Sequence, residues 1–150
     1  MLTLRWVEHG TAEYEALVEL RRMILRAPLG LDFSQEELEQ EADQFQLGAW
    51  VEERAVGTLV LNPLNTDDVQ MRQVAVDASC QGQGIGRALV LEAERHAQER
   101  GFQTILAHAR LTAVPFYESL GYDVDPVEYL EVGIPHQTVQ KSLASPGVRP

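Results

Sequence analysis

Three alternating glycines in the run Gln81-Gly82-Gln83-Gly84-Ile85-Gly86 are the first candidate for chemistry in this sequence. Residues 71–76 before the run are typical of a buried strand, and residues 87–100 after it are typical of an amphipathic helix. A glycine-rich turn that opens a helix directs several free backbone N–H groups at one point, and its glycines carry no Cβ to obstruct an anion. The run therefore predicts a phosphate- or pyrophosphate-binding loop.

Two familiar phosphate-binding motifs do not match this run. A Walker loop needs Lys followed by Ser or Thr after its last glycine, whereas Arg87 and Ala88 follow Gly86 here. The dinucleotide fingerprint Gly-x-Gly-x-x-Gly places its last glycine one residue later. A strand-to-helix turn that binds no ligand has the same local sequence, so this alternative stays open at the level of the loop.

Two sequence blocks together resemble one enzyme family. The first is Val74-Ala75-Val76-Asp77 followed by Gln81, Gly84 and Gly86, and the second is Ala113-x-x-Phe116-Tyr117-x-x-Leu120-Gly121-Tyr122. In this order and spacing they resemble the acyl-CoA signature and the Ala-x-x-Phe-Tyr segment of the GNAT superfamily of N-acetyltransferases. The part of the chain that carries these motifs runs from about residue 71 to residue 124, and the other predicted elements fit the family's layout.

The resemblance implies an acyltransferase that moves an acetyl group from acetyl-CoA, its co-substrate, directly to a primary amine of a small molecule or peptide. It implies that loop amides hold the pyrophosphate and that the strand before the loop pairs with pantetheine. The residues expected at this cofactor-binding site are Val74, Ala75, Val76, Gln81, Gly82, Gln83, Gly84, Ile85, Gly86 and Arg87. For the Arg87 side chain, a phosphate contact and a solvated position in the first helical turn are both open.

Tyr117 is the side chain to which the resemblance assigns the general acid that protonates the departing thiolate. A phenol, with a solution pKa of about 10, suits this role. The alternative is an aromatic ring that only packs the short helix beside Phe116. Many family members carry Asn, in contact with pantetheine, where this chain has Arg110, so that contact is not transferred.

The general base is less defined. His136 lies in Glu131-Val132-Gly133-Ile134-Pro135-His136, which resembles the Gly-Ile-Pro-His segment of ElaA-like bacterial members, and is one candidate. His108 is another, and either histidine also suits a structural role. The carboxylates Asp77, Glu128 and Glu131 lie near predicted strand ends, and deprotonation through water without a dedicated base is equally open.

The expected fold is α/β, a GNAT acyl-CoA N-acyltransferase fold with a mixed, twisted central sheet flanked by helices. Strands are expected at 2–7, 47–52, 55–61, 69–76, 104–109, 122–127 and 138–143. One helix is expected to begin at the cap Thr11 and run to Ala27. A second is expected to begin at Ser34, which forms a capping box with Glu37, and to run to about Gln44. A third is expected to begin at the cap Thr112 and end at Gly121. We expect one domain over residues 1–144 and a disordered tail over 145–150.

Charge and composition limit the partners. The chain carries 12 basic and 23 acidic residues, a net charge of −11, which disfavours nucleic acid and anionic membranes. This charge suits a cationic amine acceptor, although solubility alone accounts for it equally well. Five acidic residues of one segment are expected on a solvated helix face: Glu36, Glu37, Glu39, Glu41 and Asp43.

The remaining reactive residues predict little further chemistry. Cys80 is the only cysteine, so no internal disulfide forms, and a structural role is favoured over a nucleophile. His9, His96, His108 and His136 lack metal-ligand spacing, so no metal is expected. Residues 1–6 do not resemble a secretory signal, and a cytoplasmic location is the expectation.

Two other function classes remain open from the sequence. One is a non-catalytic acyl-CoA sensor that keeps the cofactor site and regulates a partner. The other is a general phosphate- or nucleotide-binding module. Members of the family often form homodimers, and no feature of this sequence decides between a homodimer and a monomer.

Overall fold

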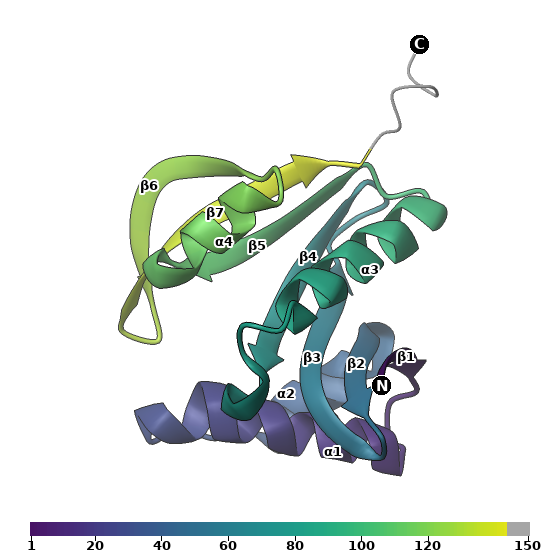
Figure 1. Cartoon of the computed structure of the whole chain (residues 1–150). Coiled ribbons are helices and arrows are strands. Elements are labelled where there is room, and N and C mark those ends of the chain that lie inside the picture. The colour runs from purple at the N-terminus through teal and green to yellow at the C-terminus, as the bar shows by residue number, and fades with distance from the viewer. Residues whose placement is uncertain (144–150) are drawn as a thin grey trace. The chain divides into compact units, whose positions relative to one another are not determined.

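Seven strands form one mixed sheet in the computed structural model, which describes residues 1–143, and their order is β1-β2-β3-β4-β5-β7-β6 (Figure 1). The strands are β1 (Leu2–Val7), β2 (Phe45–Val51), β3 (Arg54–Pro63), β4 (Asp68–Val76), β5 (Thr104–Arg110), β6 (Asp123–Glu131) and β7 (Ile134–Ser142). The α-helices are α1 (Ala12–Arg21), α2 (Gln35–Gln40), α3 (Ile85–Glu99) and α4 (Val114–Ser119). The expected mixed α/β class is confirmed.

The chain divides into two compact units. The first contains Met1–Asn62 and Arg72–Ala93, and the second contains Pro63–Met71 and the chain from Glu94 onward. The single domain over residues 1–144 stays a prediction. The predicted disordered tail, 145–150, lies outside the described residues.

In the first unit, α1 begins where the sequence predicts. The Thr11 side chain accepts a hydrogen bond from the Tyr14 N–H at 3.2 Å, which caps the helix. The regular α-helix ends at Arg21 rather than Ala27, because Arg22–Arg26 form a π-helical turn and Ala27–Leu29 a 3₁₀ turn. Gly30 then ends the segment with a φ of +71°.

The α2 segment confirms one expectation and corrects another. Ser34 and Glu37 form the predicted capping box, with two hydrogen bonds of 3.1 Å. Glu41 does not lie on a solvated face: it is 3% exposed and paired with the buried guanidinium of Arg21. The expectation was wrong here because its buried partner lies 20 residues earlier in the chain.

A close helix–strand contact positions the start of α3. Leu47, Leu59, Ile85 and Leu89 are all buried. A Cβ added to Gly57 of β3 would lie 3.0 Å from Cδ1 of Leu89 and 3.1 Å from Cγ2 of Ile85. The absence of a side chain at Gly57 therefore allows the first turns of α3 to pack directly on β3.

In the second unit, β7 lies between β5 and β6 and pairs antiparallel with both, while residues Asp68–Met71 of β4 pair parallel with β5. The β6–β7 hairpin is longer than predicted and turns at Val132 and Gly133, so His136 lies on a strand. The predicted cap at Thr112 is wrong: Leu111–Ala113 form a 3₁₀ turn, and Ala113 precedes α4. Pro115 lies in the first turn of α4, as expected.

Candidate functional site

The glycine-rich loop begins at a firmly anchored residue. The Asp77 N–H donates to the carbonyl oxygen of Val56 on β3 at 2.8 Å. Its carboxylate accepts the Ser79 N–H at 2.9 Å and the Ser79 hydroxyl at 2.8 Å, which folds Ala78–Cys80 into a 3₁₀ turn. The chain therefore enters the loop in one direction, fixed by β3.

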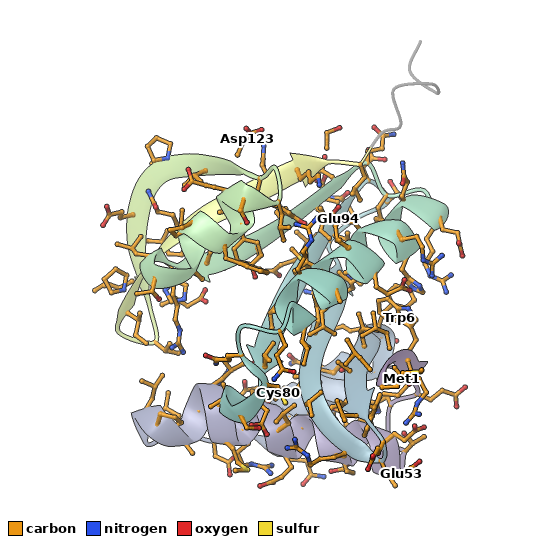
Figure 2. All side chains as sticks on the ribbon, viewed as in Figure 1. Met1, Trp6, Glu53, Cys80, Glu94 and Asp123 are labelled. Carbon is orange, nitrogen blue, oxygen red and sulfur yellow. The ribbon has the colours of Figure 1, made fainter. Side chains whose placement is uncertain are left out.

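Arg54 adds an ion pair to this anchor. Its Nη1 donates to Oδ2 of Asp77 at 3.1 Å, and its Nη2 lies 3.8 Å from the sulfur of Cys80. The Ser79 N–H, the Ser79 hydroxyl and Arg54 together hold the pKa of the Asp77 carboxyl below its usual value. Cys80 is 7% exposed and lies directly before the loop (Figure 2). These contacts favour a structural role for Cys80 at the start of the loop.

The loop itself is exposed and open. Gly82 and Gly84 each have a φ of +81°, and a Cβ built on either would meet no atom within 4 Å. A glycine is thus favoured at both positions because of the positive φ, and not because a side chain there would meet neighbouring atoms. Residues 81–84 are exposed, whereas Ile85 is buried beneath them. The loop therefore offers its backbone to solvent while the next residue fixes it to the core.

Helix α3 opens directly from the loop. The Ala88 N–H donates to the carbonyl oxygen of Gly84 at 3.0 Å, which is the first turn's hydrogen bond. The N–H groups of Ile85, Gly86 and Arg87 precede it and have no acceptor within the helix. With the helix dipole, such a terminus stabilises an anion by about 0.3–1 kcal/mol per charge. The 15-residue helix α3 is long enough to carry this dipole.

The strand that leads to the loop contains a backbone irregularity. Gln73 has a φ of +56°, which is uncommon for a residue with a side chain. The parallel register with β5 runs from Asp68↔Thr104 to Met71↔Ala107, two residues before this point. Val74, Ala75 and Val76 follow it, with Ala75 buried. No pattern in the sequence signals the unusual conformation of Gln73.

Tyr117 lies on α4 and is 5% exposed. Burial raises the pKa of its phenol to about 12. Its ring packs edge-on against Phe116 at 5.1 Å and Tyr122 at 5.5 Å, and its hydroxyl makes no hydrogen bond to any described residue. The hydroxyl thus keeps its proton at neutral pH and is not committed to a structural partner.

A hydrogen-bonded cluster of Glu94, Tyr122 and Lys141, called the polar clamp here, includes the ring on which Tyr117 packs. Tyr122 donates to Oε2 of Glu94 at 2.8 Å, and Lys141 donates to Oε1 of Glu94 at 3.0 Å and to the Leu120 carbonyl at 2.9 Å. Glu94, labelled in Figure 2, therefore ties α3 to the end of α4 and to β7. The clamp fixes Tyr122, against which the Tyr117 ring packs.

The second unit brings both histidine base candidates to one carboxylate. Nδ1 of His108 lies 2.9 Å from Oε1 of Glu131, and Nε2 of His136 lies 3.7 Å from Oε2 of Glu131. His136 is 4% exposed, whereas the Glu131 side chain is 46% exposed. Each of these three residues is a separate base candidate in the sequence, which gives no sign that they meet.

The other two histidines make different contacts. Nε2 of His9 contacts the Leu38 carbonyl at 2.7 Å, and Arg100 donates to Nε2 of His96 at 2.7 Å. Within residues 1–143, no group of three or more His, Cys, Asp or Glu side chains has the geometry of a metal site. In the same range, no helix has the length and apolar character needed to cross a bilayer.

Comparison with known proteins places these features in a family. Residues 13–122 match the model of the acetyltransferase (GNAT) family. A crystal structure from Lactobacillus plantarum has a TM-score of 0.85 at 26% identity, over 95% of this chain and 99% of the other. A crystal structure of an aminoglycoside 6′-N-acetyltransferase complexed with coenzyme A has a TM-score of 0.81 at 18% identity, over 99% of each chain.

Escherichia coli ElaA shares the fold, with a TM-score of 0.78 at 19% identity over 94% of this chain and 99% of ElaA. At this identity the likeness shows the fold alone, so membership of an ElaA-like subgroup stays a prediction. The family model covers the glycine loop, the start of α3 and Tyr117, which are the residues that carry the predicted resemblance. The chain therefore belongs to the acetyltransferase (GNAT) family and is an acyltransferase of that type.

Proposed function

We propose that this protein transfers an acetyl group from acetyl-CoA directly to a primary amine of a small molecule or peptide. The observation that carries the proposal is the exposed glycine turn at the start of α3, where three helical N–H groups lack an intrahelical acceptor. A related fold, the aminoglycoside 6′-N-acetyltransferase, was solved with coenzyme A. Acetyl-CoA supplies the activated thioester.

The residues of the loop fit such a co-substrate. The N–H groups from Gly82 to Arg87 would hold the pyrophosphate, and the open space above Gly82 and Gly84 leaves room for it. The guanidinium of Arg87, which is exposed, would add a phosphate contact. Gln81 and Gln83 flank the glycines, and Ile85 anchors the turn in the core.

The strand residues Val74, Ala75 and Val76 would pair through their backbone with the pantetheine arm, as an added strand does. One of these N–H groups would polarise the thioester carbonyl, which stabilises the charge that develops there. Gln73, with its φ of +56°, directly precedes these residues, so it sets the direction of their backbone groups.

Tyr117 would donate its phenolic proton to the departing thiolate. Its pKa of about 12 keeps it protonated at neutral pH, and its hydroxyl makes no hydrogen bond to another described residue. A pKa this far above neutrality weakens the drive for proton donation, so transfer has to be concerted with bond cleavage. His136 would accept the proton of the amine, because its Nε2 is not occupied by the Ile134 carbonyl contact at Nδ1.

The test is release of CoA thiol from acetyl-CoA with pooled amine acceptors, for wild type and Tyr117→Phe. We expect acceptor-dependent release that falls about 10²–10⁴-fold in the variant, the usual contribution of general acid catalysis. Tyr14→Phe is the matched control, because Tyr14 is a buried tyrosine outside the proposed site. Binding of acetyl-CoA without release for any amine would instead support the non-catalytic sensor.

A further inference from the structure

The contacts of His136 determine which of its nitrogens can bind a donor. Nδ1 lies 2.7 Å from the carbonyl oxygen of Ile134. A carbonyl oxygen only accepts hydrogen bonds, so Nδ1 carries the proton. In neutral His136, Nε2 is therefore an acceptor, and it points toward Glu131.

Nε2 of His136 thus faces a second acceptor. Its distance to Oε2 of Glu131 is 3.7 Å, longer than a hydrogen bond. Two acceptors at this spacing are complementary to a cation with several N–H donors, and a primary ammonium has three.

Neighbouring groups hold this arrangement and leave one side open. The Tyr129 ring stacks on His136 at 6.1 Å and meets His108 edge-on at 5.6 Å, while its hydroxyl lies 3.1 Å from Oγ1 of Thr138. His108 fixes one oxygen of Glu131 at 2.9 Å. Because the Glu131 side chain is half exposed, a ligand can approach from the carboxylate side.

We propose that Glu131 and His136 bind the ammonium group of a cationic amine, with Glu131 as its counter-ion and Nε2 of His136 as a second acceptor. His108 is a positioning residue that orients Glu131. The inference rests on the proposed acetyl transfer and names its acceptor class: an amine that is positively charged at neutral pH. The net charge of −11 favours the approach of such a molecule.

Binding is tested without turnover by titrating 1,5-diaminopentane into the protein and recording imidazole ¹⁵N spectra. We expect the signals of His108 and His136 to shift and those of His9 and His96 to stay, since the latter contact the Leu38 carbonyl and Arg100. Glu131→Gln should weaken binding at least tenfold. Glu128→Gln removes one charge from the same strand and should change binding less than twofold.

A second test compares KM for two acceptors in the acetyl-transfer assay. One is 1,5-diaminopentane, and the other is aniline, which is mostly uncharged at pH 7.5. Glu131→Gln should raise KM for the diamine at least tenfold and leave KM for aniline and for acetyl-CoA within twofold. His108→Phe should raise KM for the diamine alone, and His108→Asn, which keeps a donor near Nδ1, should restore it. Equal effects on both acceptors, or equal effects of the two Glu→Gln variants, would overturn the inference.

The two proposals fail separately. Histidine shifts confined to His108 and His136 without thiol release would refute acetyl transfer and support the ammonium site. Thiol release with an unchanged KM for the diamine in Glu131→Gln would refute the ammonium site and support acetyl transfer.

Discussion

Arg21 and Glu41 form an ion pair in which both side chains are buried from solvent. The side chain of Arg21 is 0% exposed and that of Glu41 is 4% exposed. Tyr14 donates a second hydrogen bond to Oε1 of Glu41 at 2.8 Å, and the guanidinium lies 4.9 Å over the ring of Phe33. Nε and Nη1 of Arg21 have no hydrogen-bond partner among the described residues. The pair therefore joins α1 to the end of α2 with its charges only partly compensated.

The first prediction concerns this pair. Arg21→Met should lower the free energy of unfolding by about 3–5 kcal/mol, because it leaves a buried carboxylate without a counter-ion. The double variant Arg21→Met/Glu41→Leu should recover most of that loss, since a buried pair replaced by apolar groups is often neutral. Urea denaturation measures both values.

The exposed pair Arg5–Glu13 is the control, with side chains that are 39% and 50% exposed. Glu13→Gln should change the free energy of unfolding by less than about 1 kcal/mol. A double variant as unstable as Arg21→Met would show that the Met substitution acts through packing and not through the uncompensated charge.

The second prediction is a loss of stability in alkaline solution. A tyrosine in the unfolded chain has a pKa of 10.0, whereas burial raises the pKa of Tyr117 to about 12 in the folded protein. The stabilisation is complete below pH 10 and is lost as the pH rises through the folded pKa, with about 1.4 kcal/mol gone by pH 11. Burial raises the pKa of Tyr14 and Tyr122 too, so their contributions have the same sign.

Urea midpoints measured from pH 8 to pH 11 check this prediction. Tyr117→Phe should lose less stability over this range than wild type, by about 1.4 kcal/mol. Parallel curves for the two proteins would contradict the raised pKa of Tyr117.

Local sequence predicted the parts of the fold and of the site that depend on neighbours in the chain. The cap at Thr11 and the capping box of Ser34 and Glu37 involve residues three apart, and both are confirmed. The glycine loop also follows from local chemistry, because positive φ and an open backbone are properties of Gly82 and Gly84 themselves.

Contacts between residues far apart in the chain do not follow from local sequence. Glu131 meets His108 because the β6–β7 hairpin turns at Val132 and Gly133 and β7 then pairs with β5, a register no single segment specifies. The strand lengths predicted for this hairpin were too short for the same reason. The cap predicted at Thr112 was wrong for a local reason instead, because Leu111–Ala113 form a 3₁₀ turn and Ala113 precedes α4.

The third prediction uses that hairpin turn. Val132 has a φ of +46° and Gly133 a φ of +76°, the pattern of a two-residue turn with both central residues left-handed. A β-branched residue is unfavourable there, whereas Asn tolerates it. Val132→Asn should therefore raise the free energy of unfolding by about 1 kcal/mol. Thermal denaturation measures the gain, and Val132→Ile, which keeps the β-branch, should show none.

The fourth prediction separates loop conformation from ligand binding. Gly84→Ala places a side chain at a φ of +81° where no atom lies within 4 Å, so the cost is backbone strain of about 1–2 kcal/mol. Relief of that strain would redirect the N–H groups that follow Gly84, so acetyl-CoA affinity should fall at least tenfold by calorimetry.

Gly10→Ala is the matched control, because Gly10 has a φ of +84° and equally open surroundings. It should lose similar stability and bind acetyl-CoA normally, and equal losses of affinity in both variants would refute a specific role for the loop.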